Sequence, residues 1–142
     1  MIVLDTNVLS ELLRAAADPA VLRWVAAQVP GSLHTTAVTQ AEMLYGARQI
    51  APGKRQQQLL ASMSAMFEED FTERVLPFDS DAADAYARIA AERKRAGKPI
   101  SQFDAQIAAI TLVNGAVLAT RNVGDFKSCG LEVINPWLSI PA

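Results

Sequence analysis

The sequence has very few of the residues that form disulfides or bind zinc. Its 142 residues include one cysteine, Cys129, and one histidine, His34. A single cysteine excludes an internal disulfide framework and fits a reducing compartment, so we expect a cytoplasmic protein. The shortage of both residue types also argues against a zinc site and against chemistry that needs two histidines. A catalytic metal would therefore be a hard cation bound by oxygen atoms.

Long apolar runs are also absent. No segment reaches the roughly 20 apolar residues that cross a bilayer, and no basic, then apolar, leader opens the chain, so neither membrane association nor secretion is expected. Hydrophobic residues make up 51% of the chain and charged residues 20%, the composition of an ordinary globular protein. The length fits one domain, residues 1–142. The net charge of −2 does not by itself indicate nucleic-acid binding.

Short apolar segments alternate with helix-like segments along the chain. The expected strands are residues 2–4, 33–38, 74–78, 116–120 and 131–134. The expected helices are residues 8–13, 20–27, 40–47, 54–67, 82–96 and 101–113, with caps at Asp18-Pro19, Thr39 and residues 79–81. This alternation predicts an α/β fold, a three-layer α/β/α domain around a mostly parallel sheet of about five strands.

Four acidic residues stand where expected strands end or the following helices begin. Asp5 ends the first strand, and Asp125 follows the strand that ends at residue 120. Glu42 and Asp104 each lie in the first turn of an expected helix. Because the carboxyl ends of parallel strands share one edge of a sheet, we expect these carboxylates to line one cleft.

Clustered carboxylates repel one another, so such a cleft is stable at neutral pH mainly when it holds cations. Carboxylate oxygens favour Mg²⁺ or Mn²⁺. A divalent cation can activate water and stabilise a phosphate during in-line displacement, so the cluster indicates phosphodiester hydrolysis.

Each acid also has a simpler structural interpretation. Asp5 would serve equally well as the cap of the next helix. Glu42 and Asp104 lie among apolar neighbours, where an unpaired carboxylate costs several kcal/mol, so a functional role is favoured for them. Surface charge or helix capping is the better interpretation for the other acids considered: Glu68, Glu69, Asp70, Asp79, Asp81 and Asp84.

Five short motifs occur in order: IVLDTNVLSE at residues 2–11, AEMLYG at 41–46, DAQIAA at 104–109, LATRN at 118–122 and VINPW at 133–137. Together they resemble PIN-domain proteins, specifically VapC-type toxin ribonucleases of the FitB-like branch. The resemblance implies a Mg²⁺- or Mn²⁺-dependent endoribonuclease that a VapB-like antitoxin inhibits. It also implies metal-binding roles for Asp5, Glu42 and Asp104. Thr6, Asn7 and Thr120 match the polar residues that accompany those acids.

Asn122 departs from this resemblance, because many PIN-domain proteins have an aspartate after the Thr-Arg pair. Asparagine offers one neutral oxygen and would weaken a second metal. Asp125, three residues further on, either replaces that acid as a fourth catalytic carboxylate or only structures its loop. The departure bears on the number of metals and on turnover, and not on the fold.

The expected mechanism follows from the acids and the resemblance. Asp5 and Asp104 bind the principal metal, and Glu42 binds it directly or through water. Cleavage would leave a 5′-phosphate and a 3′-hydroxyl. With the site acids set aside, the rest of the chain is weakly positive. Arg121 is the first candidate for an RNA phosphate contact, and the others are Arg14, Arg48, Lys54, Arg55 and Lys127.

A run of basic residues, Arg-Lys-Arg at 93–95, is expected to be a helix C-terminus, which favours positive charge.

Two of the expected helices carry more apolar residues than the core of one small domain needs. These residues are either core or the surface of a homodimer and of a groove for an antitoxin segment: Met43, Leu44, Tyr45, Leu59, Leu60, Met63, Met66 and Phe67.

Three other functions are weighed against a ribonuclease. A haloacid-dehalogenase-like phosphatase needs a second aspartate two residues after the first, where this chain has Asn7. A DNA nuclease can use the same metal site, but such enzymes are usually longer. A non-catalytic partner-binding module is suggested by Asn122 and opposed by the retained Asp5, Glu42 and Asp104.

Overall fold

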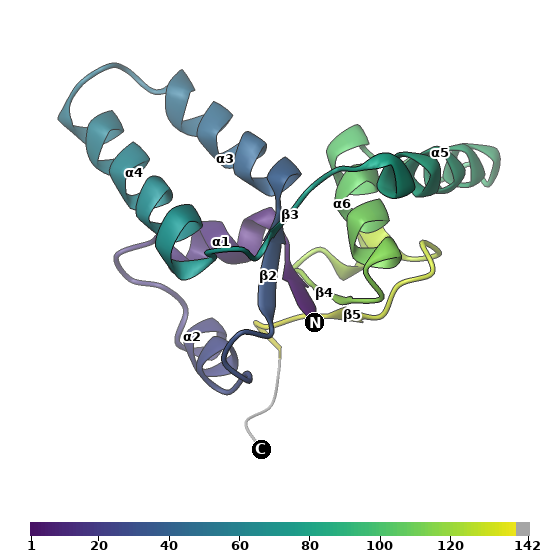
Figure 1. Cartoon of the computed structure of the whole chain (residues 1–142), viewed down its shortest axis with the longest axis horizontal. Coiled ribbons are helices and arrows are strands. Elements are labelled where there is room, and N and C mark those ends of the chain that lie inside the picture. Colours follow the sequence, from purple (N-terminus) through teal and green to yellow (C-terminus); the bar gives the residue numbers. More distant parts are fainter. Residues whose placement is uncertain (139–142) are drawn as a thin grey trace.

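Five short parallel strands lie at the centre of the computed structural model, which describes residues 1–138 (Figure 1). The strands are β1 (Ile2–Leu4), β2 (Leu33–Thr36), β3 (Val75–Leu76), β4 (Val117–Ala119) and β5 (Val133–Ile134). Their order across the sheet is β3-β2-β1-β4-β5. The α-helices are α1 (Thr6–Leu12), α2 (Pro19–Ala26), α3 (Ala37–Gln49), α4 (Lys54–Ala65), α5 (Ser80–Arg95) and α6 (Gln102–Val113). The predicted three-layer α/β architecture is confirmed.

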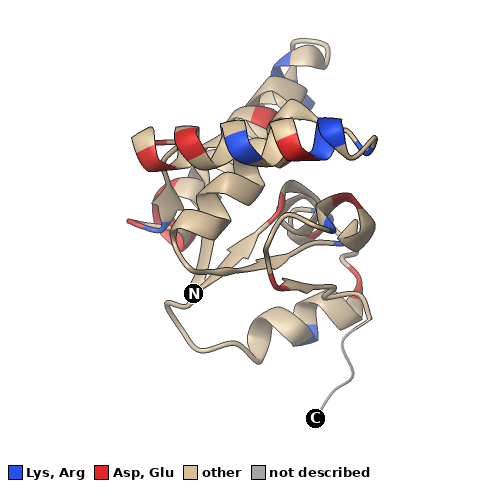
Figure 2. Cartoon of the chain, turned by 90° about the vertical axis from the view of Figure 1, so that its right-hand side faces the viewer, with Lys and Arg blue, Asp and Glu red and all other residues tan. Residues whose placement is uncertain are grey.

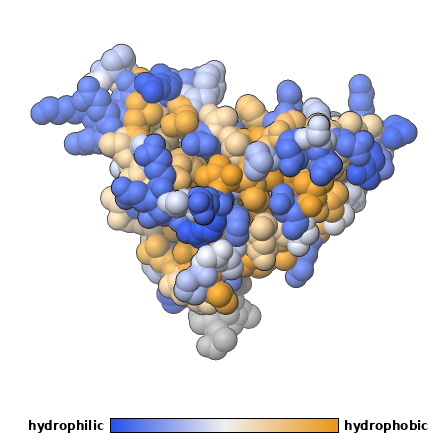
Figure 3. All heavy atoms as spheres, in the orientation of Figure 1, coloured by the Kyte–Doolittle hydropathy of each residue, from blue (hydrophilic) through white to orange (hydrophobic). Residues whose placement is uncertain are grey.

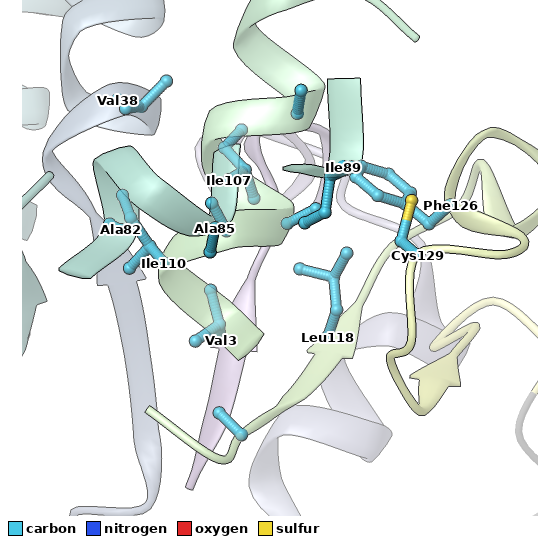
Figure 4. Close-up of a cluster of buried hydrophobic side chains, with 14 residues drawn as sticks. Val3, Val38, Ala82, Ala85, Ile89, Ile107, Ile110, Leu118, Phe126 and Cys129 are labelled. Atoms are coloured by element: carbon cyan, nitrogen blue, oxygen red, sulfur yellow. The ribbon is translucent and has the colours of Figure 1, made fainter. Parts of the chain in front are cut away.

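The two faces of the sheet bury separate hydrophobic clusters, because neighbouring residues of a strand point to opposite faces. On one face Val3 and Leu118 pack with α5 and α6, and Phe126 closes the cluster (Figure 4). On the other face Leu4 and Ala119 pack with residues of α1, α2, α3 and α4. Each strand is short, so burial on both faces and not its length stabilises it.

Polar side chains fix where the helices begin. Asp5 caps α1, Asp18 caps α2 with Pro19 in its first turn, and Asp79 caps α5. Ser101 caps α6. Each of these side chains accepts a hydrogen bond from a backbone N–H that would otherwise lack a partner in the first turn.

The expectation that Thr39 caps the third helix is wrong. Thr36 is the cap, and its hydroxyl accepts a 3.0 Å hydrogen bond from the Thr39 backbone N–H. Consequently β2 ends at Thr36, earlier than predicted, and Glu42 lies in the second turn of α3 and not in the first. The predicted helix over residues 54–67 also ends early, because α4 gives way to a π-helical turn at Met66–Asp70.

The apolar residues of α3 and α4 belong mostly to the core. Met43, Met63, Met66 and Phe67 are buried, whereas the Tyr45 side chain is 65% exposed. The others pack partly against the same cluster: Leu44, Leu59 and Leu60. These residues therefore do not form the broad apolar surface that one interpretation of the sequence required. In the view of Figure 3, apolar residues gather in the middle of the face and hydrophilic residues cover its outer ends.

Both acidic and basic residues lie along α5, with acidic residues at its beginning and basic residues at its end (Figure 2). Arg88 and Asp84 form an exposed ion pair there at 3.2 Å. The basic residues of the last turn stand at the helix C-terminus, as expected. Arg93, however, is buried and donates hydrogen bonds to the carbonyl oxygens of Lys98, Asp125 and Lys127. It therefore fastens the loop that carries Asp125.

In residues 1–138, no helix is both long and apolar enough to cross a membrane.

Candidate acidic active site

The candidate site lies where β1 and β4 end side by side. The two strands pair in parallel, with Leu4 opposite Ala119, and the Asp5 N–H donates to the Ala119 carbonyl at 2.9 Å. This register brings Asp5 next to Thr120, the first residue after β4. Two segments more than a hundred residues apart in sequence thus meet at one sheet edge.

Asp5 is held by hydrogen bonds to both carboxylate oxygens. The Thr120 hydroxyl donates to Oδ2 at 2.7 Å, and the Thr6 N–H donates to Oδ1 at 2.8 Å. The Asn7 amide also donates to Oδ2, at 3.3 Å. Asp5 is only 4% exposed, and this burial raises its pKa even though the donors act in the opposite direction. The cap interpretation and the functional interpretation of Asp5 are therefore compatible.

Glu42 reaches the same place from α3. Its Oε1 accepts a 2.9 Å hydrogen bond from the Thr6 hydroxyl, and the Thr6 N–H donates to Asp5, so Thr6 links the two acids. Burial raises the pKa of Glu42, and the neighbouring charges of Asp5 and Asp104 raise it further. Glu42 therefore lies close enough to Asp5 and Asp104 for their charges to act on it.

Asp104 comes from the first turn of α6. Its backbone N–H donates to the Ser101 hydroxyl at 3.2 Å, which fixes the start of the helix. Burial is the largest cause that raises the pKa of Asp104, and repulsion from Asp125 adds to it. Asp104 also contributes to the raised pKa values of Asp5 and Glu42.

These three acids line one pocket of about 500 Å³. Of the two candidates for the fourth position, Asn122 lies in the same pocket. Asp125 instead lines a neighbouring cavity of about 190 Å³, which Asp104 and Arg93 also line. The expectation that all four carboxylates line one pocket is therefore not met: Asp125, on the 3₁₀ turn Val123–Phe126, lines the second cavity, and Asp104 lines both.

The donor chemistry fits a divalent cation. Within residues 1–138, the two ion pairs are Arg14–Glu11 and Arg88–Asp84, so none of Asp5, Glu42 and Asp104 forms an ion pair, although Arg14 and Glu11 line the same pocket. In that same part of the chain, no three acidic, histidine or cysteine side chains are grouped so as to hold one ion together. Mg²⁺ commonly binds through one or two carboxylates and retains several water molecules, so the carboxylate oxygens that line this pocket are ligands of the kind it prefers.

Several pocket residues were not singled out as parts of the acidic site from the sequence. Ser10, Glu11, Arg14 and Trp137 line the pocket with the acids. Glu11 is buried and accepts hydrogen bonds from Arg14 at 3.1 Å and from the Asp18 N–H at 2.9 Å. Its position within the first motif was the available signal, because a glutamate on a buried helix face needs a partner.

These observations define the class of protein: a parallel α/β domain with an acidic pocket at the carboxyl edge of its sheet. The PIN-domain family model matches residues 2–128, and the chain belongs to the PIN-domain family. The VapC ribonuclease Y4jK of Sinorhizobium fredii is 42% identical over 137 residues, which cover 96% of this chain and 98% of that protein. Toxin FitB of Neisseria gonorrhoeae is 35% identical over 137 residues, with 96% and 99% covered.

Solved structures agree with this assignment. The structure of FitAB bound to the IR36 DNA fragment superposes with a TM-score of 0.90 at 35% identity, covering 99% of both chains. FitAcB from Neisseria gonorrhoeae gives a TM-score of 0.87 at 33% identity, covering 98% of this chain and 100% of that one. The resemblance stated from the five motifs is confirmed.

Proposed function

We propose that this chain is the toxin of a type II toxin–antitoxin pair and a Mg²⁺- or Mn²⁺-dependent endoribonuclease. One observation carries the proposal: Asp5, Glu42 and Asp104 share a pocket, burial and neighbouring carboxylates raise their pKa values, and within residues 1–138 none of the three forms an ion pair with a basic side chain. Relatives named VapC ribonuclease and tRNA(fMet)-specific endonuclease support RNA as the substrate.

In this proposal Asp5 and Asp104 hold the cation, and Glu42 holds it directly or through water. Thr120 and Asn7 keep the Asp5 carboxylate in place, since both donate to its Oδ2. Thr6 does the same for Glu42. A bound Mg²⁺ or Mn²⁺ supplies water activation and charge stabilisation at the scissile phosphate. Asn122 offers a neutral oxygen in the pocket, and Asp125 acts on Asp104 from the neighbouring cavity.

The proposed partner is a VapB-like antitoxin, because solved relatives are toxin–antitoxin complexes. An apolar groove of about 750 Å³ is a suitable docking place for its segment. Residues of β1, α1, α2, the end of α4 and the π-helical turn that follows it line the groove, among them Leu4, Leu12, Val25 and Met66. We also propose that the chain acts in the cytoplasm as a homodimer or as a toxin–antitoxin hetero-oligomer. Light scattering of the purified chain at micromolar concentration tests the homodimer, and a monomeric mass would exclude it.

The first test is cleavage of tRNA by the purified chain with Mn²⁺, with Mg²⁺ and with a chelator. We expect cleavage that needs the metal and leaves 5′-phosphate ends. Ends with a 2′,3′-cyclic phosphate would exclude the mechanism, because they require attack by the ribose 2′-hydroxyl. Preferred cleavage of DNA would favour the related DNA nucleases. Metal binding without cleavage of any RNA would favour a partner-binding module.

Replacing Thr120 tests the support of Asp5. Thr120→Val removes the 2.7 Å donor to Oδ2 while keeping the shape of the buried side chain. We expect RNA cleavage to fall about 10-fold to 100-fold, as for other residues that orient a metal ligand. Thr111→Val is the matched control, since Thr111 is equally buried but its hydroxyl donates to the Ile107 carbonyl within α6. Equal activity of the two variants would contradict the role assigned to Thr120.

A further inference from the structure

Arg121 is tied by its backbone to the acidic site. Its N–H donates to the Asn7 side-chain oxygen at 3.1 Å, and Asn7 in turn donates to Asp5 and Thr120. The residue therefore follows the same sheet edge as the carboxylates, and its side chain lines their pocket. A cation placed there is close to any phosphodiester that enters the pocket.

The Arg121 side chain does not pair with those carboxylates. Within residues 1–138 it forms no ion pair, although Asp5, Glu42 and Asp104 line the same pocket, as does Glu11. Its guanidinium carbon lies instead over the Trp137 ring, 5.1 Å from the ring centroid. An aromatic face attracts a guanidinium without using its N–H donors in hydrogen bonds. Among residues 1–138 these donors have no hydrogen-bond acceptor, so they are available to bind an anion.

Trp137 is held in place by its own contacts with the protein. Its backbone N–H donates to the Asn135 side chain at 2.9 Å, and its ring packs partly against the core cluster that contains Leu4 and Val8. The ring is therefore a firm support on which a long, exposed arginine side chain rests. Without that support, Arg121 would be free to turn towards the acids, where a cation competes with metal for the carboxylates.

We propose that Arg121 and Trp137 form the subsite for the phosphate next to the scissile bond of a single-stranded RNA, in which Arg121 contacts the phosphate and Trp137 is the positioning residue that holds the guanidinium. The inference rests on the proposed ribonuclease function and adds a binding role for the C-terminal tryptophan. Arginine suits this task because its planar group offers paired donors that match phosphate oxygens.

The test is a double-mutant cycle on RNA binding, in which cleavage is silenced by Asp5→Asn. The probe is a fluorescently labelled single-stranded RNA titrated at several KCl concentrations. Trp137→Leu keeps apolar bulk but removes the aromatic face, and Trp137→Phe keeps an aromatic face. Each change is combined with Arg121→Gln. Arg88→Gln is the control for charge, because Arg88 lies on the outward face of α5.

We expect Trp137→Leu to weaken RNA binding about threefold to tenfold, and Trp137→Phe to restore most of the loss. Arg121→Gln should lower the salt dependence, the slope of log K against log salt, by about 0.7, the value of one single-strand phosphate contact. In the Arg121→Gln background, Trp137→Leu should have no further effect, which a purely structural role would not predict. Arg88→Gln should leave the slope unchanged.

An equal loss from Trp137→Leu in both backgrounds would overturn this inference and leave the nuclease proposal standing. Melting temperatures of all variants show whether a loss arises from unfolding, and Trp137→Phe provides the comparison if Trp137→Leu does not fold. A chain that neither binds nor cleaves RNA, with its Asp5 intact, would instead overturn the proposed function, and this inference with it.

Discussion

Asp5→Asn is expected to abolish RNA cleavage, with a loss of about two orders of magnitude or more, while the protein stays folded. Asparagine keeps the size of the side chain and one oxygen that can cap α1, but it lacks the charge that binds a cation. It also presents an amide donor where Thr120 and Asn7 already donate. Stabilisation of the transition state by a metal is worth several kcal/mol, which sets the size of the loss.

Asp79→Asn is the matched control for this change. Asp79 also caps a helix, accepting a 2.9 Å hydrogen bond from the Ala82 N–H, but it lies outside the acidic pocket. The two variants therefore share any cost of weakening a helix cap and differ in the metal site. Initial rates with saturating Mn²⁺ are the measurement. Equal rates for both variants would place catalysis elsewhere in the chain.

Without metal, the protein is expected to lose stability as the pH rises from about 4 to neutrality. The folded state raises the pKa values of Asp5, Glu42 and Asp104 above their ordinary values of 3.8, 4.5 and 3.8. Their contribution is fully present below the ordinary values and is lost as the pH rises through the folded values. Urea unfolding in EDTA at a series of pH values measures this slope. A stability that rises over the same range would contradict it.

Mg²⁺ should reverse this loss at pH 7. A hundredfold excess over the dissociation constant adds about 2.7 kcal/mol, or about 5–10 °C in melting temperature, for a chain of this size. The gain should shrink at pH 5, where protons compete for the carboxylates. Asp104→Asn should raise the melting temperature in EDTA by a few degrees and remove most of the Mg²⁺ response.

Asp84→Asn is the control, because it removes one negative charge from the exposed face of α5. It should neither raise the melting temperature in EDTA nor reduce the response to Mg²⁺. A Mg²⁺ response that survives in Asp104→Asn would move the cation away from Asp104.

The layout of the fold could be predicted from sequence because local signals were strong. Caps at Asp18 and Asp79, continuous apolar strands and the spacing of the helices all agree with the structure. Boundaries were less reliable where two capping residues compete. Thr36 and Thr39 are both able to cap α3, and only the end of β2 decides between them.

The candidate site, like the fold, was predictable in part from the sequence. The three acids of the pocket were predicted as candidates from their places at strand ends and helix starts, and their metal-binding roles remain proposals. The interpretation of Asp125 depended on the path of a loop, and Arg93 of α5, which lies 32 residues earlier in the sequence, fixes that path. Such long-range contacts leave no mark in local sequence pattern. The Arg121–Trp137 contact is of the same kind.

The sequence alone determined the class of fold, through its local periodicity, and the likeness to PIN-domain proteins, through five short motifs. Its shortage of cysteine and histidine led to the expectation that any catalytic metal is bound by oxygen atoms. The tertiary structure decided which acids share a pocket and which apolar residues are core. It also decided that the Arg121 side chain lies beside the acids without forming an ion pair with them. These depend on register between strands and on packing between distant helices, where the side chains of one segment determine the surroundings of another.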